Sequence, residues 1–228
     1  MTFNFSKEPL PNSREYLFSD AKCLKLDLTV PFEEMAEEAK ALRSKFILYR
    51  NNDGYDHRGW WSLPIHGLGL DKPMSWDAYD YASPNEAAKD FRWTEIAEQC
   101  PVTVNWLKTV FPSQRYGRVR FMLLEAGGYI SPHSDGPHRI PEPVNVALTN
   151  PKGCEWHWGD GGILDFPPGT AYAMNISYEH SVYNNSNEDR YHLIIHHHDS
   201  TPEWKDMMKL ALEKQDETGY FYYSQDLY

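Results

Sequence analysis

The stretch that decides the fold is residues 118–198, and it begins RVRFMLLEAGGYISPHSDGPHR at 118–139. It continues to SYEHSVYN at 177–184 and ends EDRYHLIIHHH at 188–198. Between these segments, short runs of apolar residues alternate with Gly- and Pro-rich turns, and GDGG at 159–162 is a strong signal for a β-hairpin. Short strands at even spacing predict a sandwich or barrel, and jelly rolls belong to this group.

Two histidines and one aspartate in this stretch form a candidate metal site. His133 and Asp135 are an H-x-D pair, and the i, i+2 spacing puts both side chains on one face of an extended strand end. His180 must be brought alongside them by the fold. Two imidazoles and one carboxylate on one face of a metal are the ligand set of non-haem Fe(II) oxygenases, which leaves coordination positions open. The alternatives are ordinary polar residues, or another metal such as zinc in a cupin-like binding protein.

Arg190 is the candidate anion anchor. It alternates with His192 along the predicted strand that ends the stretch. If that face points into the barrel, the guanidinium group can hold a carboxylate through two parallel hydrogen bonds. The alternative is a surface ion pair with Glu188 or Asp189, and exposed pairs of this kind are common.

The same stretch resembles the aspartyl/asparaginyl β-hydroxylase group of 2-oxoglutarate/Fe(II)-dependent oxygenases, which has free-proline hydroxylases as relatives. The matching segments are EAGGYISPHSD at 125–135, NVALTNPKGCEW at 145–156, GGILDFPPGTAYAMNISYEHSVYN at 161–184 and DRYHLIIHHH at 189–198. The resemblance implies a double-stranded β-helix (jelly-roll, cupin-like) core. It also implies that His133, Asp135 and His180 bind iron as the catalytic residues, and that Arg190 holds the distal carboxylate of 2-oxoglutarate.

The implied reaction is hydroxylation of an unactivated C–H bond of an amino acid, free or within a peptide or protein. Fe(II), 2-oxoglutarate and O₂ are the implied cofactors, and succinate and CO₂ the implied products. Asp135 argues against a halogenase, in which a small residue replaces the carboxylate and leaves room for halide. The best-known vertebrate member differs, because it lacks this carboxylate and has arginines shortly after its first histidine. The competing hypothesis is a non-catalytic cupin-like protein that binds a metal or a small molecule.

Further pocket candidates surround these residues. Arg118 and Arg120 share one face of a predicted strand, opposite apolar side chains. If the arginine face points inward, the buried guanidinium groups need anionic partners such as a substrate carboxylate or 2-oxoglutarate; the alternative is solvent exposure. A Pro-rich loop that follows the metal ligands is a candidate lid. The candidates for cosubstrate binding are Arg190, Arg120 and His192, and those for substrate binding are Arg118, Arg139, His138, Asn145 and Trp158.

The amino-acid composition indicates which kinds of binding partner and which cellular compartment to expect. A hydrophobic content of 41% favours a packed core over disorder, and a net charge of −11 argues against nucleic acid or an anionic membrane as the partner. The three cysteines are an odd number without a C-x-x-C motif, which favours a reducing compartment. The sequence shows neither a signal peptide nor an apolar run of the ~20 residues that span a bilayer. We expect a cytoplasmic protein whose partner is an amino acid or a peptide side chain.

We predict one oxygenase domain over residues 1–228, mainly β with flanking helices. Its parts are a mixed α/β support at 1–115, the jelly-roll core with the metal site at 116–200, and a C-terminal helix and tail at 201–228. The apolar periodicity predicts helices at 32–42, 101–110 and 203–214. Gly127-Gly128 is turn chemistry and is predicted to end the first strand of the core.

Overall fold

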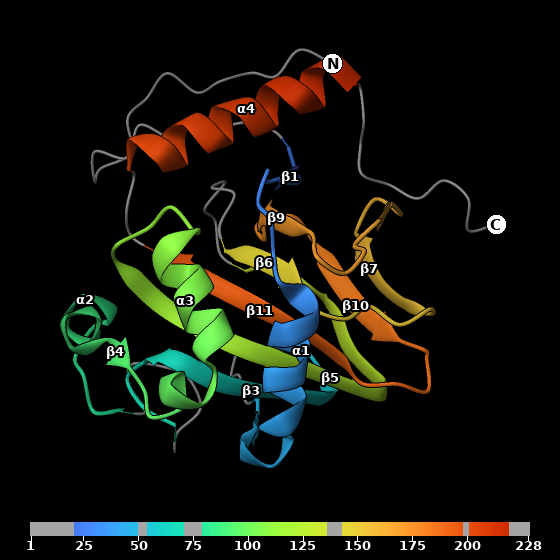
Figure 1. The fold of residues 1–228 in the computed structure, drawn as a ribbon. Helices are drawn as coiled ribbons and strands as arrows, with labels where there is room; N and C mark the ends of the chain where they lie inside the picture. The colour runs from blue at the N-terminus through green and yellow to red at the C-terminus, as the bar shows by residue number, and fades with distance from the viewer. Residues whose placement is uncertain (1–20, 50–53, 71–78, 136–142, 198–200, 219–228) are drawn as a thin grey trace.

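The computed structural model describes residues 21–49, 54–70, 79–135, 143–197 and 201–218. Eleven strands in these ranges form one curled, antiparallel sheet, and helices lie against one of its faces (Figure 1). The strands are β1 (Cys23–Lys25), β2 (Ile47–Leu48), β3 (His57–Gly67), β4 (Arg92–Trp93), β5 (Tyr116–His133), β6 (Val144–Ala147), β7 (Cys154–Trp158), β8 (Ile163–Leu164), β9 (Ala171–Met174), β10 (His180–Asn184) and β11 (Arg190–His197). The helices are α1 (Phe32–Ala41), α2 (Pro84–Ala87), α3 (Pro101–Thr109) and α4 (Pro202–Thr218), with 3-10 turns η1 (Arg43–Lys45), η3 (Ala88–Asp90) and η4 (Ala97–Gln99).

The long strand β5 is shared by two branches of the sheet. One edge of β5 pairs with β3, and the other pairs with β11 in its first half and with β10 near its end. β10 continues to β7 and β8, whereas β11 continues to β6, β9 and β1. The two branches therefore face each other across the curl of the sheet, as expected for a double-stranded β-helix. The predicted fold class, mainly β with flanking helices around a jelly-roll core, is confirmed.

The prediction that Gly127-Gly128 ends the strand is wrong, because β5 runs on to His133. Gly127 has a φ of +68°, which a residue with a side chain rarely adopts. A Cβ atom on Gly128 would lie 2.7 Å from the carbonyl oxygen of Arg58 and 2.8 Å from that of Glu125. The two glycines thus allow a sharp bend with close backbone contact, and at this bend the partner of β5 changes from β11 to β10. A glycine pair suits a turn or a bend equally well, and the sequence alone does not distinguish them.

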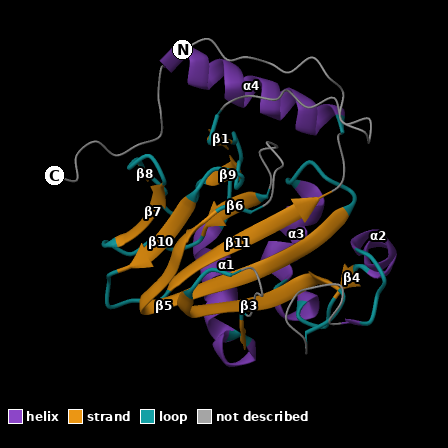
Figure 2. Cartoon of the chain, turned by 180° about the vertical axis from the view of Figure 1, so that it is seen from behind, coloured by secondary structure: helices purple, strands orange, loops and turns teal. Residues whose placement is uncertain are grey.

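Alternation along β5 directs its side chains into two separate cores. Val119, Phe121 and Leu123 face the larger core, which includes buried residues of α1, α3 and α4. Arg120 and Met122 point to the other face, inside the curl of the sheet. Figure 2 shows this inner face in front, with α1 and α3 behind the sheet. Of the two orientations that the sequence leaves open, the structure has the arginine face inward, and burial of the apolar face by helices makes this orientation stable.

The helices α1 and α3 are joined by a side-chain cap. α3 begins with Pro101 in its first turn, and its own N-cap residue offers no side-chain hydrogen bond. The carboxylate of Glu38 in α1 accepts hydrogen bonds from the backbone N–H groups of Val102 (2.7 Å) and Thr103 (3.0 Å) and from the Thr103 hydroxyl (2.7 Å). A negative charge at this helix terminus is also favoured by the helix dipole. Glu38 therefore fixes the helical layer that supports the outer face of the sheet.

Cys23, Cys100 and Cys154 are buried and free. Burial raises the pKa of both the Cys23 and the Cys100 thiol to about 12, so these groups stay protonated. Over the ranges that the structure describes, no helix has the length and apolarity that crossing a membrane requires.

We predict that Glu38→Ala lowers the free energy of unfolding by about 1–2 kcal/mol, the usual effect of removing a helix cap. Denaturant unfolding followed by circular dichroism measures this change. Glu37→Ala is the matched control, because Glu37 is in the same helix and contacts only the exposed Lys40; its effect should stay within about 0.5 kcal/mol. Equal effects of the two substitutions would contradict the role of Glu38 as a cap.

Candidate metal centre

The fold brings together the three predicted metal ligands. His133 ends β5, His180 begins β10, and the two residues are direct cross-strand partners. Asp135 follows β5, and its backbone N–H donates to the carbonyl oxygen of Ile176 (2.8 Å), which continues the pairing beyond the strand. The candidate ligand atoms of the three side chains all lie within 4.8 Å of one another. One ion can therefore contact all three residues.

The hydrogen bonds of the two imidazoles leave one nitrogen of each ring available to a metal. Nδ1 of His133 lies 2.8 Å from the carbonyl oxygen of Ser131, and Nδ1 of His180 lies 2.9 Å from that of Tyr178. A carbonyl oxygen only accepts, so both Nδ1 atoms carry the proton and both Nε2 atoms have a free lone pair. This arrangement is the usual one for metal-binding histidines.

Aromatic rings hold the two imidazoles in place. Tyr55 stacks on His133 with ring centroids 3.7 Å apart and planes 15° from parallel, and Trp156 stacks on His180 at 4.9 Å and 2°. Burial, and then the charge of His133, lower the pKa of His180 to about 4. His180 is therefore neutral at physiological pH, as a metal ligand must be.

A pocket of about 440 Å³ opens beside the three ligands. Besides the ligands, its lining has an aromatic part, consisting of Tyr49, Trp60 and Trp156, and a basic part, which comprises Arg118, Arg120, Arg190, His192 and His196. Asn145 also lines the pocket and is buried. The aromatic side chains exclude water, whereas the basic ones favour an anionic ligand.

Arg190 is the first residue of β11 and is only 1% exposed. Its Nη1 atom lies 3.2 Å from Nδ1 of His192, whereas Nε and Nη2 have no hydrogen-bond partner among the residues that the structure describes. A buried guanidinium group with two unpaired nitrogens is costly, and a carboxylate that binds both of them would remove this cost. Arg190 thus has the properties of an anion anchor inside the pocket.

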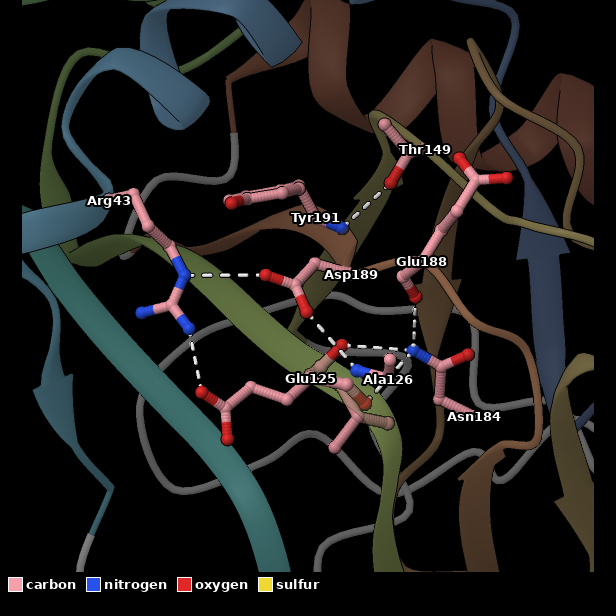
Figure 3. Close-up of polar contacts among 9 residues, drawn as sticks. Arg43, Glu125, Ala126, Thr149, Asn184, Glu188, Asp189 and Tyr191 are labelled. Carbon is pink, nitrogen blue, oxygen red and sulfur yellow. Dashed lines mark hydrogen bonds and ion pairs between the residues drawn. The ribbon is translucent and has the colours of Figure 1, made fainter.

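The alternative interpretation of Arg190, an ion pair with a neighbouring carboxylate, does not hold. Figure 3 shows the carboxylate of Asp189 directed at Arg43, with which it pairs (3.3 Å), and at the backbone N–H of Ala126, from which it accepts a hydrogen bond (3.1 Å). Glu188 contributes its backbone carbonyl to Asn184 rather than a carboxylate to Arg190. Both acidic neighbours are therefore directed elsewhere.

Four of the other predicted pocket residues line the pocket, and one does not. Arg118, Arg120, Asn145 and His192 line the pocket, whereas Trp158 does not and instead packs in the inner core against Trp156 and the edge of His180. Trp158 was a candidate because it shares one face of β7 with Trp156. Of these two residues, only Trp156 lines the pocket. His138 and Arg139 lie outside the described residues.

Several pocket residues were missed in the sequence. Tyr49 and Trp60 line the pocket, and Tyr55 stacks on His133; all three come from the N-terminal part of the chain. No local signal marked them, because the pairing of β3 with β5 brings this part of the chain to the pocket. Burial, and then the charge of Arg118, lower the pKa of Arg120 to about 9. The Arg120 side chain therefore remains protonated at neutral pH.

A curled antiparallel sheet that holds two histidines and one carboxylate beside a basic pocket defines the class of mononuclear non-haem oxygenases. The sequence pattern of the Aspartyl/Asparaginyl beta-hydroxylase family matches residues 31–199, about three quarters of the chain. The chain belongs to this family. It is an oxygenase of the hydroxylase type, as the sequence predicted, and not a non-catalytic cupin-like protein.

Several solved structures show a weak similarity to this chain at low sequence identity. A prolyl-4-hydroxylase from Pseudomonas putida is 14% identical, with a TM-score of 0.43 over 79% of this chain and 95% of its own. A viral collagen prolyl hydroxylase from Paramecium Bursaria Chlorella virus-1 is 13% identical, with a TM-score of 0.39 over 79% and 97%. A 2OG-Fe(II) oxygenase family oxidoreductase from Burkholderia pseudomallei is 14% identical, with a TM-score of 0.41 over 70% and 76%. Among curated proteins, none matches significantly. At these similarities we infer nothing further from the individual structures.

The neutral state of buried His192 predicts a pH dependence of stability. Burial, and then the charges of Arg190 and Arg120, hold its pKa well below the ordinary 6.5. Below about pH 6.5 the unfolded chain binds a proton at this residue that the folded protein does not bind, so the free energy of unfolding falls as the pH falls. The slope from this one group is at most about 1.4 kcal/mol per pH unit.

We therefore predict that His192→Gln makes the metal-free protein less sensitive to acid. Unfolding free energies from denaturant titrations at about pH 5, 6 and 8 test this, and about pH 8 is the internal reference because His192 is neutral in both states there. An equal loss of stability on acidification in the variant and the native protein would contradict the buried, neutral state of His192.

Proposed function

We propose that the protein is an Fe(II)- and 2-oxoglutarate-dependent dioxygenase. In this proposal it hydroxylates an unactivated C–H bond of an amino acid, free or within a peptide or protein, and releases succinate and CO₂. The observation that carries the proposal is the presence, in one pocket, of a three-residue ligand set and a buried guanidinium group with two unpaired nitrogens. The ligand set would bind the iron, and the guanidinium group would bind a carboxylate of a dicarboxylic cosubstrate.

His133, Asp135 and His180 would hold the iron through two imidazole nitrogens and a carboxylate oxygen. The donor set fits Fe(II), because both Nδ1 protons are used by backbone carbonyls and the Nε2 atoms are available. Bound there, Fe(II) supplies the activation of dioxygen. Three protein ligands leave positions for the cosubstrate and O₂, and the stacked rings of Tyr55 and Trp156 keep the ligand imidazoles oriented.

Arg190 and His192 would bind the distal carboxylate of 2-oxoglutarate together. A guanidinium group can only donate, so the contact of Arg190 Nη1 with His192 Nδ1 makes that ring nitrogen an acceptor. The neutral His192 ring then carries its proton on Nε2 and is a second hydrogen-bond donor. Arg120 faces the same pocket and adds positive charge to it.

Arg118 and Asn145 are the proposed substrate contacts among the described residues, since both line the pocket. Tyr49, Trp60 and Trp156 would pack on the substrate and keep water from the reaction centre. The net charge of −11 supports a small molecule or peptide as the partner rather than nucleic acid. We also propose a cytoplasmic location, which the three free cysteines support.

We predict that anaerobic addition of Fe(II) and then 2-oxoglutarate produces a weak charge-transfer band in the visible spectrum. His133→Ala and Asp135→Ala should each abolish both the band and succinate release, because each removes an iron ligand. His157→Ala is the matched control: His157 contacts Glu155 and lies outside the pocket, so its band should match that of the native protein. Absence of the band, together with no succinate release in a screen of free amino acids and short peptides, would overturn the proposed function.

For the cosubstrate anchor we predict that Arg190→Ala raises the KM for 2-oxoglutarate by about 100-fold, the effect of removing one partner of a buried charged pair. Arg190→Lys should be intermediate, because lysine keeps the charge but lacks the planar fork of donors. Arg92→Ala, which removes an arginine from a distant exposed site, is the control. Steady-state kinetics at varied 2-oxoglutarate measure the effect, and an unchanged KM in Arg190→Ala would mean that another basic residue binds the cosubstrate.

A further inference from the structure

His180 and Arg190 lie on one continuous segment that changes branch of the sheet between them. β10, with His180, pairs with β7, whereas β11, with Arg190, pairs with β6. Residues 185–189 form the corner between the two strands, opposite the bend of β5 at Gly127 and Gly128. A cosubstrate bound as proposed spans both branches, from the metal near His180 to Arg190. The geometry of this corner therefore sets the distance that the cosubstrate must span.

Asn184, the last residue of β10, ties the corner to the bend of β5. Its Nδ2 atom donates to the carbonyl oxygens of Leu124 (3.0 Å), Glu125 (3.0 Å) and Glu188 (2.8 Å). Two amide hydrogens serve three acceptors, so one hydrogen is shared. Figure 3 shows the amide of Asn184 between the backbones of Glu125 and Glu188. Its Oδ1 atom accepts hydrogen bonds from the backbone N–H (3.3 Å) and the hydroxyl (2.6 Å) of Ser186.

A second set of contacts holds the residues on either side of Arg190 from the outer face of the sheet. Asp189 pairs with Arg43, and Arg43 also pairs with Glu125 (2.6 Å) on β5. The backbone N–H of Tyr191 donates to the hydroxyl of Thr149 (2.8 Å). The side chains of Arg43, Glu125 and Asp189 are 38%, 35% and 32% exposed, so solvent weakens these ion pairs. Asn184 is fully buried, and its loss would remove hydrogen bonds to three backbone carbonyl oxygens.

We infer that Asn184 is a positioning residue for Arg190, and that it thereby determines the affinity for the distal carboxylate of the cosubstrate. This inference rests on the proposed function. Asn184 does not line the pocket, so it acts only through the backbone that carries Arg190. Asp189 and Arg43 assist from the outer face with a smaller effect.

The test is the affinity of the Mn(II)-loaded protein for two ligands, measured by calorimetry in the absence of substrate. The first is 2-oxoglutarate. The second, 2-oxobutyrate, has the same 2-oxo acid group but no distal carboxylate, so it does not use Arg190. Asn184→Ala should raise the dissociation constant for 2-oxoglutarate about tenfold, which is the size of effect expected from the loss of one or two hydrogen bonds to a charged group. The dissociation constant for 2-oxobutyrate should not change. Asn185→Ala, an exposed asparagine of the same corner, should change neither.

The Arg190→Ala background separates positioning from a general loss of structure. If Asn184 acts through Arg190, Asn184→Ala causes no further loss of 2-oxoglutarate affinity in that background. If Asn184→Ala does not fold, the Asp189→Asn variant is measured in its place. Asp189→Asn should raise the dissociation constant for 2-oxoglutarate about threefold and leave that for 2-oxobutyrate unchanged. Equal weakening of both ligands, or no weakening of either, overturns the inference. Failure of the native protein to bind 2-oxoglutarate would instead contradict the proposed function.

Discussion

The bend in β5 at Gly127 and Gly128 is the constraint on which the rest of the molecule depends. Close contact between the backbones of Gly128 and Glu125 permits no side chain at the bend. Because β5 bends instead of ending, one strand pairs in succession with β11 and with β10. The first pairing directs the arginine face into the curl of the sheet, and the second sets His133 opposite His180. The candidate metal ligands and the candidate anion anchor thereby come to share one pocket.

Arg190 places a buried positive charge in the pocket, and this charge supports the proposed binding of a carboxylate. Burial lowers the pKa of Arg190 below its ordinary value, yet arginine remains charged at any physiological pH. A charge in this environment is stabilised by a bound anion more than by water that the aromatic residues exclude. Burial of this charge opposes folding, and the proposed binding of a carboxylate to Arg190 would offset that cost.

Much of the fold and part of the site could be predicted from the sequence. The i, i+2 spacing of His133 and Asp135 and the helical periodicity at 32–42 are local signals, and the structure brings the first pair together with His180 and contains the helix as α1. Contacts that depend on strand register had no local signal: Tyr55 on His133, and Asn184 against the backbone of β5. Gly127-Gly128 was ambiguous, because glycine permits a turn and a bend alike.

The measurement that tests the central claim most directly is a crystal structure of the protein grown without oxygen in the presence of Mn(II) and 2-oxoglutarate. The account predicts one metal ion bound by His133, Asp135 and His180, and the distal carboxylate of 2-oxoglutarate at about 2.7–2.9 Å from Nε and Nη2 of Arg190. A metal ion bound elsewhere, or a carboxylate held away from Arg190 while those two nitrogens stay unpaired, would contradict it.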